Sequence, residues 1–189
     1  MRLFVAVEID PAVLDRIAAC SAELRRRSAV AARARISWAR PDRLHVTVRF
    51  IGEVDGGRAE AIVAALEPAL SVAAFDLTVE DVGTFPAQGP PRVLWAGIAR
   101  GLDALRAVEV EVSGRLDRCG IAREPRAYHP HVTLARVREA GGLRTAQWLD
   151  GLAGRQFGTS RVNAITLFQS RPSPQGHEYV ALQRTALAT

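Results

Sequence analysis

The chain has no lysine, few cysteines and no long hydrophobic run, and each absence narrows the classes of function open to it. All 25 basic residues are arginines, against 20 acidic residues, which gives a formal net charge of +5. Such a complete bias, in a sequence this rich in alanine, indicates genome base composition more than selection for binding. A positive charge nevertheless suits an anionic partner such as phosphate or RNA.

The two cysteines, Cys20 and Cys119, are too few for a disulfide framework or a zinc site. Both lie in segments with helical periodicity, where we expect them to act as small apolar residues. The apolar stretch from Leu3 to Val7 is too short for a signal peptide, and no segment reaches the length of a membrane span. We therefore expect a cytoplasmic protein that does not contact a membrane.

Two of the four histidines occur in copies of one tripeptide, His45-Val46-Thr47 and His131-Val132-Thr133. Residues two apart on a strand point to the same face, so each copy presents an imidazole beside a hydroxyl. Apolar residues occupy the opposite faces of the two expected strands: Val46, Val48 and Phe50 in the first, and Val132 and Leu134 in the second. The pattern predicts that one face of each strand packs into the core and that the other face carries the reactive side chains.

The two copies lie in two halves of the chain that repeat one order of expected elements: strand, helix, strand, helix, strand. The first half has strands over 3–7, around His45 and over 75–82, with helices over 11–24 and 59–70. The second half has strands over 93–98, around His131 and over 162–168, with helices over 102–119 and 143–152. A final strand is expected over 178–182.

This repeat predicts one α+β domain over residues 1–189, built from two pseudo-symmetric lobes. Each lobe is expected to be an antiparallel sheet with helices packed outside. The lobes correspond roughly to residues 1–85 and 92–189, with strands free to exchange between them, and the Gly- and Pro-rich stretch 83–91 forms the crossover. One His-x-Thr strand then belongs to each lobe, and the active site lies in the cleft between them.

A pair of imidazoles suits in-line displacement at phosphorus, which needs a base for the attacking water and an acid for the departing oxygen. Histidine serves both roles because its ordinary pKa is about 6.5. Each proton transfer is typically worth roughly 10²–10⁴ in rate. The hydroxyls of Thr47 and Thr133 can donate to the non-bridging oxygens, and a nearby arginine can neutralise their charge. This chemistry requires no metal.

The motifs His-Val-Thr-Val at 45–48 and His-Val-Thr-Leu at 131–134 match the paired His-x-Thr-hydrophobic motifs of the two-histidine phosphoesterases. Their surroundings resemble the RNA 2′,3′-cyclic phosphodiesterases, also called LigT-like or 2′-5′ RNA ligase-like proteins. The segments that carry this resemblance are 2–7, 44–54, 91–97, 128–136 and 167–171. They cover nearly the whole chain in order, and the sequence departs from the family pattern in having Gln169 where Glu is common.

The resemblance implies hydrolysis of the terminal 2′,3′-cyclic phosphate of RNA to a 2′-phosphomonoester, and the reverse formation of a 2′-5′ linkage on suitable RNA ends. It implies that His45 is the proton donor to the leaving 3′ oxygen and that His131 is the proton acceptor from water. Thr47, Thr133 and Arg136 would bind the phosphate. No cofactor is implied, the partners are RNA ends or nucleotides with a cyclic phosphate, and we expect a monomer.

The role of Arg136 conflicts with simple strand geometry. Counting by two from His131 leads to Ala135, so Arg136 reaches the phosphate only if the strand bulges or ends before it, or if its side chain wraps round an edge. Arg49 has the right parity with His45 and is the rival candidate.

Trp38 and Tyr179 are candidates for stacking a base, whereas Phe50 has the parity of a core residue. Two other functions remain open from the motifs. One keeps the site but acts on a 2′-5′ oligonucleotide or a small cyclic sugar phosphate. The other is a module that binds RNA ends or nucleotides without turnover.

A metal site joining His45, His129 and His131 lacks a carboxylate or a further Cys or His at a suitable spacing, so we expect none. His129 is expected to be a supporting or surface group, and His177 a structural or exposed one.

Overall fold

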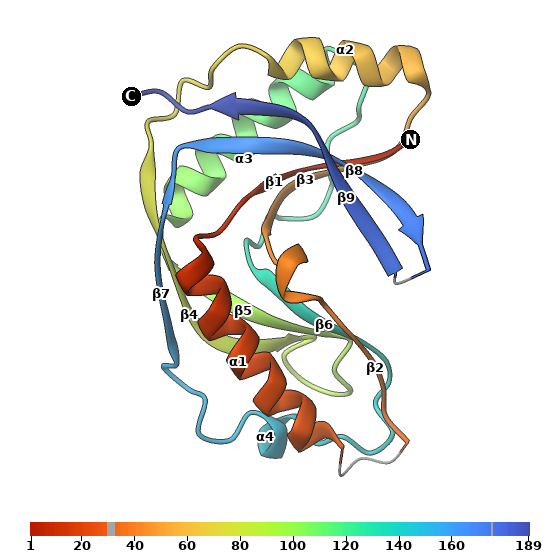
Figure 1. Ribbon diagram of the computed structural model, residues 1–189, viewed down its shortest axis with the longest axis vertical. Coiled ribbons are helices and arrows are strands. Elements are labelled where there is room, and N and C mark those ends of the chain that lie inside the picture. Colours follow the sequence, from red (N-terminus) through yellow and green to blue (C-terminus); the bar gives the residue numbers. More distant parts are fainter. Residues whose placement is uncertain (30–32, 175) are drawn as a thin grey trace.

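The computed structural model describes residues 1–29, 33–174 and 176–189 (Figure 1). Its strands are β1 (Arg2–Val7), β2 (Arg35–Trp38), β3 (Val46–Glu53), β4 (Phe75–Phe85), β5 (Val93–Arg100), β6 (Val132–Glu139), β7 (Gln156–Val162), β8 (Ala164–Ser173) and β9 (Gly176–Ala186). Its helices are α1 (Pro11–Ser28), α2 (Gly56–Leu66), α3 (Leu102–Asp117) and α4 (Thr145–Trp148), and a 3-10 turn, η1, spans Pro41–Arg43.

The strands form one curled sheet in the order β7-β4-β5-β6-β3-β1-β8-β9, and β2 pairs with the outer part of β6. Every pairing between these strands is antiparallel. The predicted α+β class with antiparallel pairing is confirmed.

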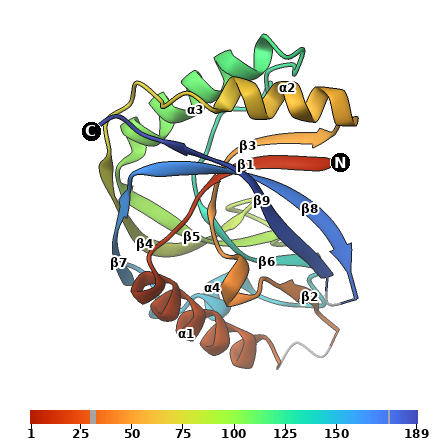
Figure 2. The same ribbon diagram turned by 45° about the horizontal axis from the view of Figure 1, so that its top comes forward.

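The sheet divides into two groups of strands, which Figures 1 and 2 show in the upper and lower parts of the molecule. The β1 group consists of β1, β3, β8 and β9, and helices α2 and α3 pack against it. The β6 group consists of β2, β4, β5, β6 and β7, and helix α1 packs against it together with α4. Helices therefore lie outside both groups of strands.

The two groups of strands are not the two halves of the sequence. Strands β8 and β9 belong to the second half of the chain but pair with β1, and β4 belongs to the first half but pairs with β5 and β7. The groups meet where β3 and β6 run side by side, and Val46 pairs with Val132 at that point.

Helix α1 shows how the apolar pattern builds the core. Pro11 stands at its first turn, where a missing backbone N–H costs nothing. Its predicted apolar face is confirmed: Val13, Ile17, Cys20 and Leu24 are all buried. Full burial of such side chains stabilises the fold by about 1.5–3 kcal/mol each for the larger ones. Cys119 lies just after α3 and is half-buried.

Several predicted element boundaries are wrong. The helix expected over 143–152 is only the short α4, which ends at Trp148, and the left-handed φ of 71° at Gly151 is incompatible with a helix through that residue. The strand expected over 162–168 is β8, which begins two residues later and extends to Ser173, and the preceding strand β7 was not predicted. Strand β2 was not predicted, and β9 is longer than the expected 178–182.

No helix within the three described ranges is long and apolar enough to cross a bilayer.

Candidate active site

The seam between the two strand groups brings the two His-Val-Thr motifs together. His45 and His131 stand immediately before β3 and β6, and the valines that follow them are fully buried partners in the antiparallel register. In that register Thr47 lies across from His131, and Thr133 lies across from His45. Directly opposed residues share a face, so both imidazoles and both hydroxyls lie on one side of the seam.

Both imidazole rings are oriented by a hydrogen bond to the backbone carbonyl two residues earlier in the chain. The Nδ1 atom of His45 lies 2.8 Å from the carbonyl oxygen of Arg43, and Nδ1 of His131 lies 2.7 Å from that of His129. A carbonyl only accepts hydrogen bonds, so Nδ1 is the protonated nitrogen in each ring. Each Nε2 atom is then available for proton transfer, and that of His45 lies 3.1 Å from the hydroxyl of Thr47.

Burial lowers the pKa of His45, and the positive charge of His131 lowers it further, against the opposing effect of the Arg43 carbonyl. Burial also lowers the pKa of His131, with smaller effects in the same direction from Arg136 and His129. The imidazole of His131 is therefore close enough to influence the ionisation of His45. Both rings are mainly neutral at pH 7 in the unliganded protein.

Aromatic side chains produce this burial. The ring of Phe4 stacks on His45 at a centroid distance of 5.0 Å, and Tyr179 meets His45 edge-on at 5.4 Å. On the other side, Phe85 meets His131 edge-on at 5.2 Å. No local pattern marks Phe4 and Phe85 as neighbours of the histidines, because each contact joins distant parts of the chain.

A β-bulge in β6 decides where Arg136 lies. Thr133 pairs with Trp95 and Ala135 with Leu94, so Leu134 is an extra residue in β6. The alternation therefore changes phase, and Ala135 and Val137 are buried while Arg136 is exposed. The bulge turns Arg136 to the face that carries Thr133.

A second bulge occurs at the equivalent place in β3. Thr47 pairs with Ala6 and Arg49 with Val5, so Val48 is the extra residue. The parity prediction for Arg49 is therefore wrong: its side chain turns inward, is only 5% exposed, and donates from Nη2 to the carbonyl of Ala122.

The same bulge overturns the prediction that Phe50 is a core residue. Phe50 is 56% exposed and occupies the place in β3 that Arg136 occupies in β6. It lies across from Phe4 in the register, with the two rings 6.3 Å apart.

A cavity of about 750 Å³ opens beside His131, and Phe50 forms part of its wall. Its lining is mainly apolar and includes Phe85, Val110 and Tyr128. Phe50 and Val110 are two of the large apolar side chains that the described surface leaves exposed. An exposed apolar wall next to a polar site suits a flat aromatic ligand.

The two predicted stacking residues, Trp38 and Tyr179, lie elsewhere. Trp38 packs edge-on against Trp148 at 6.1 Å, and the Trp148 indole in turn donates to the carbonyl of Leu24. Tyr179 lies edge-on to Phe4 at 4.9 Å and does not line the cavity that contains Phe50.

Tyr128 is a member of the site that sequence reasoning missed. Its hydroxyl donates to the backbone carbonyl of Thr47 at 3.0 Å, which ties the segment before His131 to strand β3. Burial raises the pKa of Tyr128, so the phenol remains a donor across the working pH range. The contact joins residues far apart in sequence, and nothing in the residues around Tyr128 predicts it.

The two remaining histidines contribute differently. His129 is exposed, and its carbonyl holds the ring of His131. His177 lies 3.0 Å from the hydroxyl of Ser170 in the β8–β9 hairpin. Over the described parts of the chain, no three His, Cys, Asp or Glu side chains gather in a way that could hold a metal ion.

Comparisons with known proteins agree with the motifs. The family model for LigT-like phosphoesterases matches residues 7–95 and 98–179. A protein from Archaeoglobus fulgidus, named RNA 2′,3′-cyclic phosphodiesterase, is 31% identical over 97% of this chain and 98% of its own. One of the same name from Aeropyrum pernix is 33% identical over 78% of this chain and 84% of its own.

Among solved structures, Escherichia coli LigT complexed with 3′-AMP superposes with a TM-score of 0.77 at 25% identity, covering 100% of this chain and 98% of that one. A Thermus thermophilus protein superposes with a TM-score of 0.75 at 26% identity, over 98% of this chain and 97% of its own. With the family model matched over most of its length, the chain belongs to the LigT-like phosphoesterase family.

Proposed function

We propose that the protein hydrolyses the terminal 2′,3′-cyclic phosphate of RNA to a 2′-phosphomonoester, with His45 and His131 as acid and base. The observation that carries the proposal is the Val46–Val132 register pair, which sets each imidazole across from the threonine of the other motif. The names of the curated relatives support the substrate class.

The reaction follows from the orientation of the rings. Nε2 of His131 takes a proton from water as the water oxygen attacks phosphorus, and the bond from phosphorus to the 3′ oxygen breaks. Protonated His45 gives its Nε2 proton to that leaving oxygen. Each transfer contributes about 10²–10⁴ in rate. The net change is the addition of one water to the cyclic ester.

The negative charge of the bound substrate favours the protonated form of His45, the proposed acid. Both imidazoles are mainly neutral without ligand, since burial lowers the pKa of each. A phosphodiester anion beside His45 favours the imidazolium form and raises that pKa again. Thr47 and Thr133 donate to the non-bridging oxygens, and Arg136 neutralises the charge that develops on them.

The exposed ring of Phe50 is the best-placed group to stack on the terminal base, because it lines the apolar cavity beside His131. Stacking on an aromatic ring is worth about 1–3 kcal/mol per base. Tyr179 and Trp38 stay predictions for base stacking.

The same groups also support 2′-5′ ligation of RNA ends. A 5′-hydroxyl in the place of the attacking water would form a 2′-5′ linkage, with His131 again accepting the proton and His45 protonating the 3′ oxygen.

The test is incubation of an oligonucleotide ending in a 2′,3′-cyclic phosphate with the purified protein in a metal chelator. We expect turnover by the wild type, loss of at least 100-fold in His45→Ala and His131→Ala, and little change in His177→Ala. Phosphorus NMR of the product should show a 2′-phosphate. A 3′-phosphate would exchange the roles of the two histidines, and full activity in both alanine variants would refute the proposal.

A further inference from the structure

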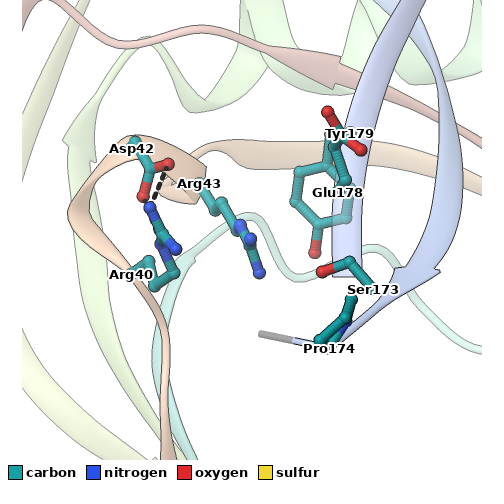
Figure 3. Close-up of a pocket in the computed structure, with 7 residues that line it drawn as sticks. All are labelled: Arg40, Asp42, Arg43, Ser173, Pro174, Glu178 and Tyr179. Atoms are coloured by element: carbon teal, nitrogen blue, oxygen red, sulfur yellow. Dashed lines mark hydrogen bonds and ion pairs between the residues drawn. The ribbon is translucent and has the colours of Figure 1, made fainter. Parts of the chain in front are cut away.

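A second cavity, of about 510 Å³, is mainly polar (Figure 3) and is lined by two residues that contact His45, namely Arg43 and Tyr179. Its walls come from two places. Arg40, Asp42 and Arg43 belong to the η1 turn and the residue before it, and Ser173, Pro174, Glu178 and Tyr179 belong to the β8–β9 hairpin.

Three hydrogen-bond donors converge in this cavity. Figure 3 shows the guanidinium group of Arg43 and the hydroxyls of Ser173 and Tyr179 pointing into the same space. The Arg43 side chain lies against the hairpin turn: a Cβ atom added at Gly176 would be 3.3 Å from its Nη1. One guanidinium and two hydroxyls are the donors that a phosphate group prefers.

Both carboxylates of the lining lie outside the space in which the three donors converge (Figure 3). Asp42 is paired with Arg40, whose Nε lies 3.0 Å from the carboxylate. Glu178 is exposed, and in Figure 3 its carboxylate points away from the three donors.

The cavity is directly connected to the acid of the proposed reaction. The backbone carbonyl of Arg43 accepts the Nδ1–H of His45, and the Tyr179 ring lies 5.4 Å from the His45 ring. A ligand held by Arg43 and Tyr179 is therefore a neighbour of whatever His45 protonates.

The covalent order of ribose then fixes what occupies each cavity. The 3′ oxygen, which His45 protonates, is on the carbon next to C4′, and C4′ carries the 5′ arm. The 2′ oxygen is on the carbon next to C1′, which carries the base. A ribose with its 3′ oxygen at His45 thus directs its 5′ arm past His45 and its base toward the apolar cavity of Phe50.

We propose that the cavity of Arg43, Ser173 and Tyr179 binds the phosphate on the 5′ oxygen of the terminal nucleotide, so that the protein recognises an RNA chain and not only its cyclic end. This rests on the proposed function. It assigns the polar cavity to the preceding phosphodiester and the apolar cavity to the base, on opposite sides of the reacting phosphorus.

The experiment compares three substrates: adenosine 2′,3′-cyclic phosphate, the same nucleotide with a 5′-phosphate, and the dinucleotide that ends in it. The readout is the gain, the ratio of kcat/KM with the 5′-phosphate group to kcat/KM without it. A ratio within one variant cancels any common effect on His45. We expect a gain of about tenfold in the wild type, for both the phosphorylated nucleotide and the dinucleotide.

In Arg43→Gln, which keeps the backbone carbonyl, the gain should fall below about twofold. The double variant Ser173→Ala/Tyr179→Phe, which removes only hydroxyl groups, should reduce it several-fold and decides the matter if Arg43→Gln does not fold. Arg184→Gln removes an equal charge at the far end of β9 and should keep the full gain. In Arg43→Gln, the slope of the logarithm of the gain against the logarithm of salt concentration should be smaller by about one.

The proposal is overturned if the wild type shows no gain, if the variants keep it, or if only the dinucleotide shows it, since the added nucleoside would then be responsible. Failure of the wild type to hydrolyse all three substrates refutes the proposed function instead.

Discussion

At the scale of single residues, ordinary contacts orient the two imidazoles for the roles proposed for them. Each ring donates Nδ1–H to a carbonyl two residues earlier in the chain, so each keeps Nε2 for proton transfer. The carbonyl partner favours the charged ring, while burial opposes it and dominates. The resulting pKa values predict a distinctive pH dependence.

The kcat/KM for a cyclic phosphate should be maximal below pH 6.5 and fall as the pH rises toward 8. The reaction needs one protonated and one neutral imidazole, and burial lowers the pKa of both from 6.5 in the free protein. Bound substrate raises the pKa of the acid, so the falling limb of kcat should lie at higher pH than that of kcat/KM. Steady-state rates measured from about pH 4.5 to about pH 9 cover both limbs, because this range spans the ionisation of histidine. An optimum of kcat/KM above pH 7 would contradict the assignment.

Arg136→Gln and Arg49→Gln should have opposite signatures. Arg136 is exposed beside the site, so its loss should lower kcat/KM about 100-fold and leave Tm unchanged. Arg49 is buried and bonded to Ala122, so its loss should lower the free energy of unfolding by about 1–3 kcal/mol. Denaturant unfolding and kinetics at a temperature where both variants are folded separate the two effects. The reverse pattern would restore Arg49 as the phosphate ligand.

At the scale of secondary-structure elements, the bulges at Val48 and Leu134 explain both what was predictable and what was not. Helical spacing correctly marked α1, since its apolar face is a local property of the sequence. The two motifs were also visible because each lies within one tripeptide. A rule of alternation failed for Arg49 and Phe50 because a bulge shifts every later residue to the other face. Val and Leu are ordinary strand residues, so neither bulge has a marker in the sequence.

The segment between α3 and β6 should depend on one phenol for its attachment to β3. Tyr128→Phe removes the hydrogen bond to the Thr47 carbonyl and retains the ring. We expect a loss of about 1 kcal/mol in unfolding free energy and a roughly fivefold lower kcat, since His131 follows directly on this segment. Calorimetry and steady-state kinetics measure the two losses. An unchanged kcat beside the lower stability would show that the bond only stabilises the fold.

At the scale of the whole molecule, the active site depends on how two groups of strands meet. The β1 group and the β6 group have separate helices on their outer sides, and both approach each other at Val46 and Val132. The relative position of the two motifs could not be predicted from either motif alone. It follows from the pairing of β3 with β6 at Val46 and Val132, which joins distant parts of the chain.

Val132→Ala should reduce activity more than its effect on stability explains. Val132 and Val108 are both fully buried, and truncation of either should cost roughly 1.5–3 kcal/mol from lost burial and the cavity left behind. Of these two valines, only Val132 lies where β3 and β6 meet, so only Val132→Ala should also lower kcat at least fivefold. Val108→Ala in α3 is the matched control. Equal kcat in the two variants would mean that the meeting point does not set the catalytic distance.

The pairing of Val46 with Val132 also bears on how such a site can arise. An antiparallel pair has a local two-fold axis through its centre, and here each threonine lies across from the histidine of the opposite strand. A shorter ancestral chain with one copy of the tripeptide would hold half of a phosphate clamp, and two identical copies docked about that axis would complete it. Gene duplication and fusion would then have freed the halves to diverge, so that one position now carries the aromatic ring of Phe50 and its counterpart the cation of Arg136.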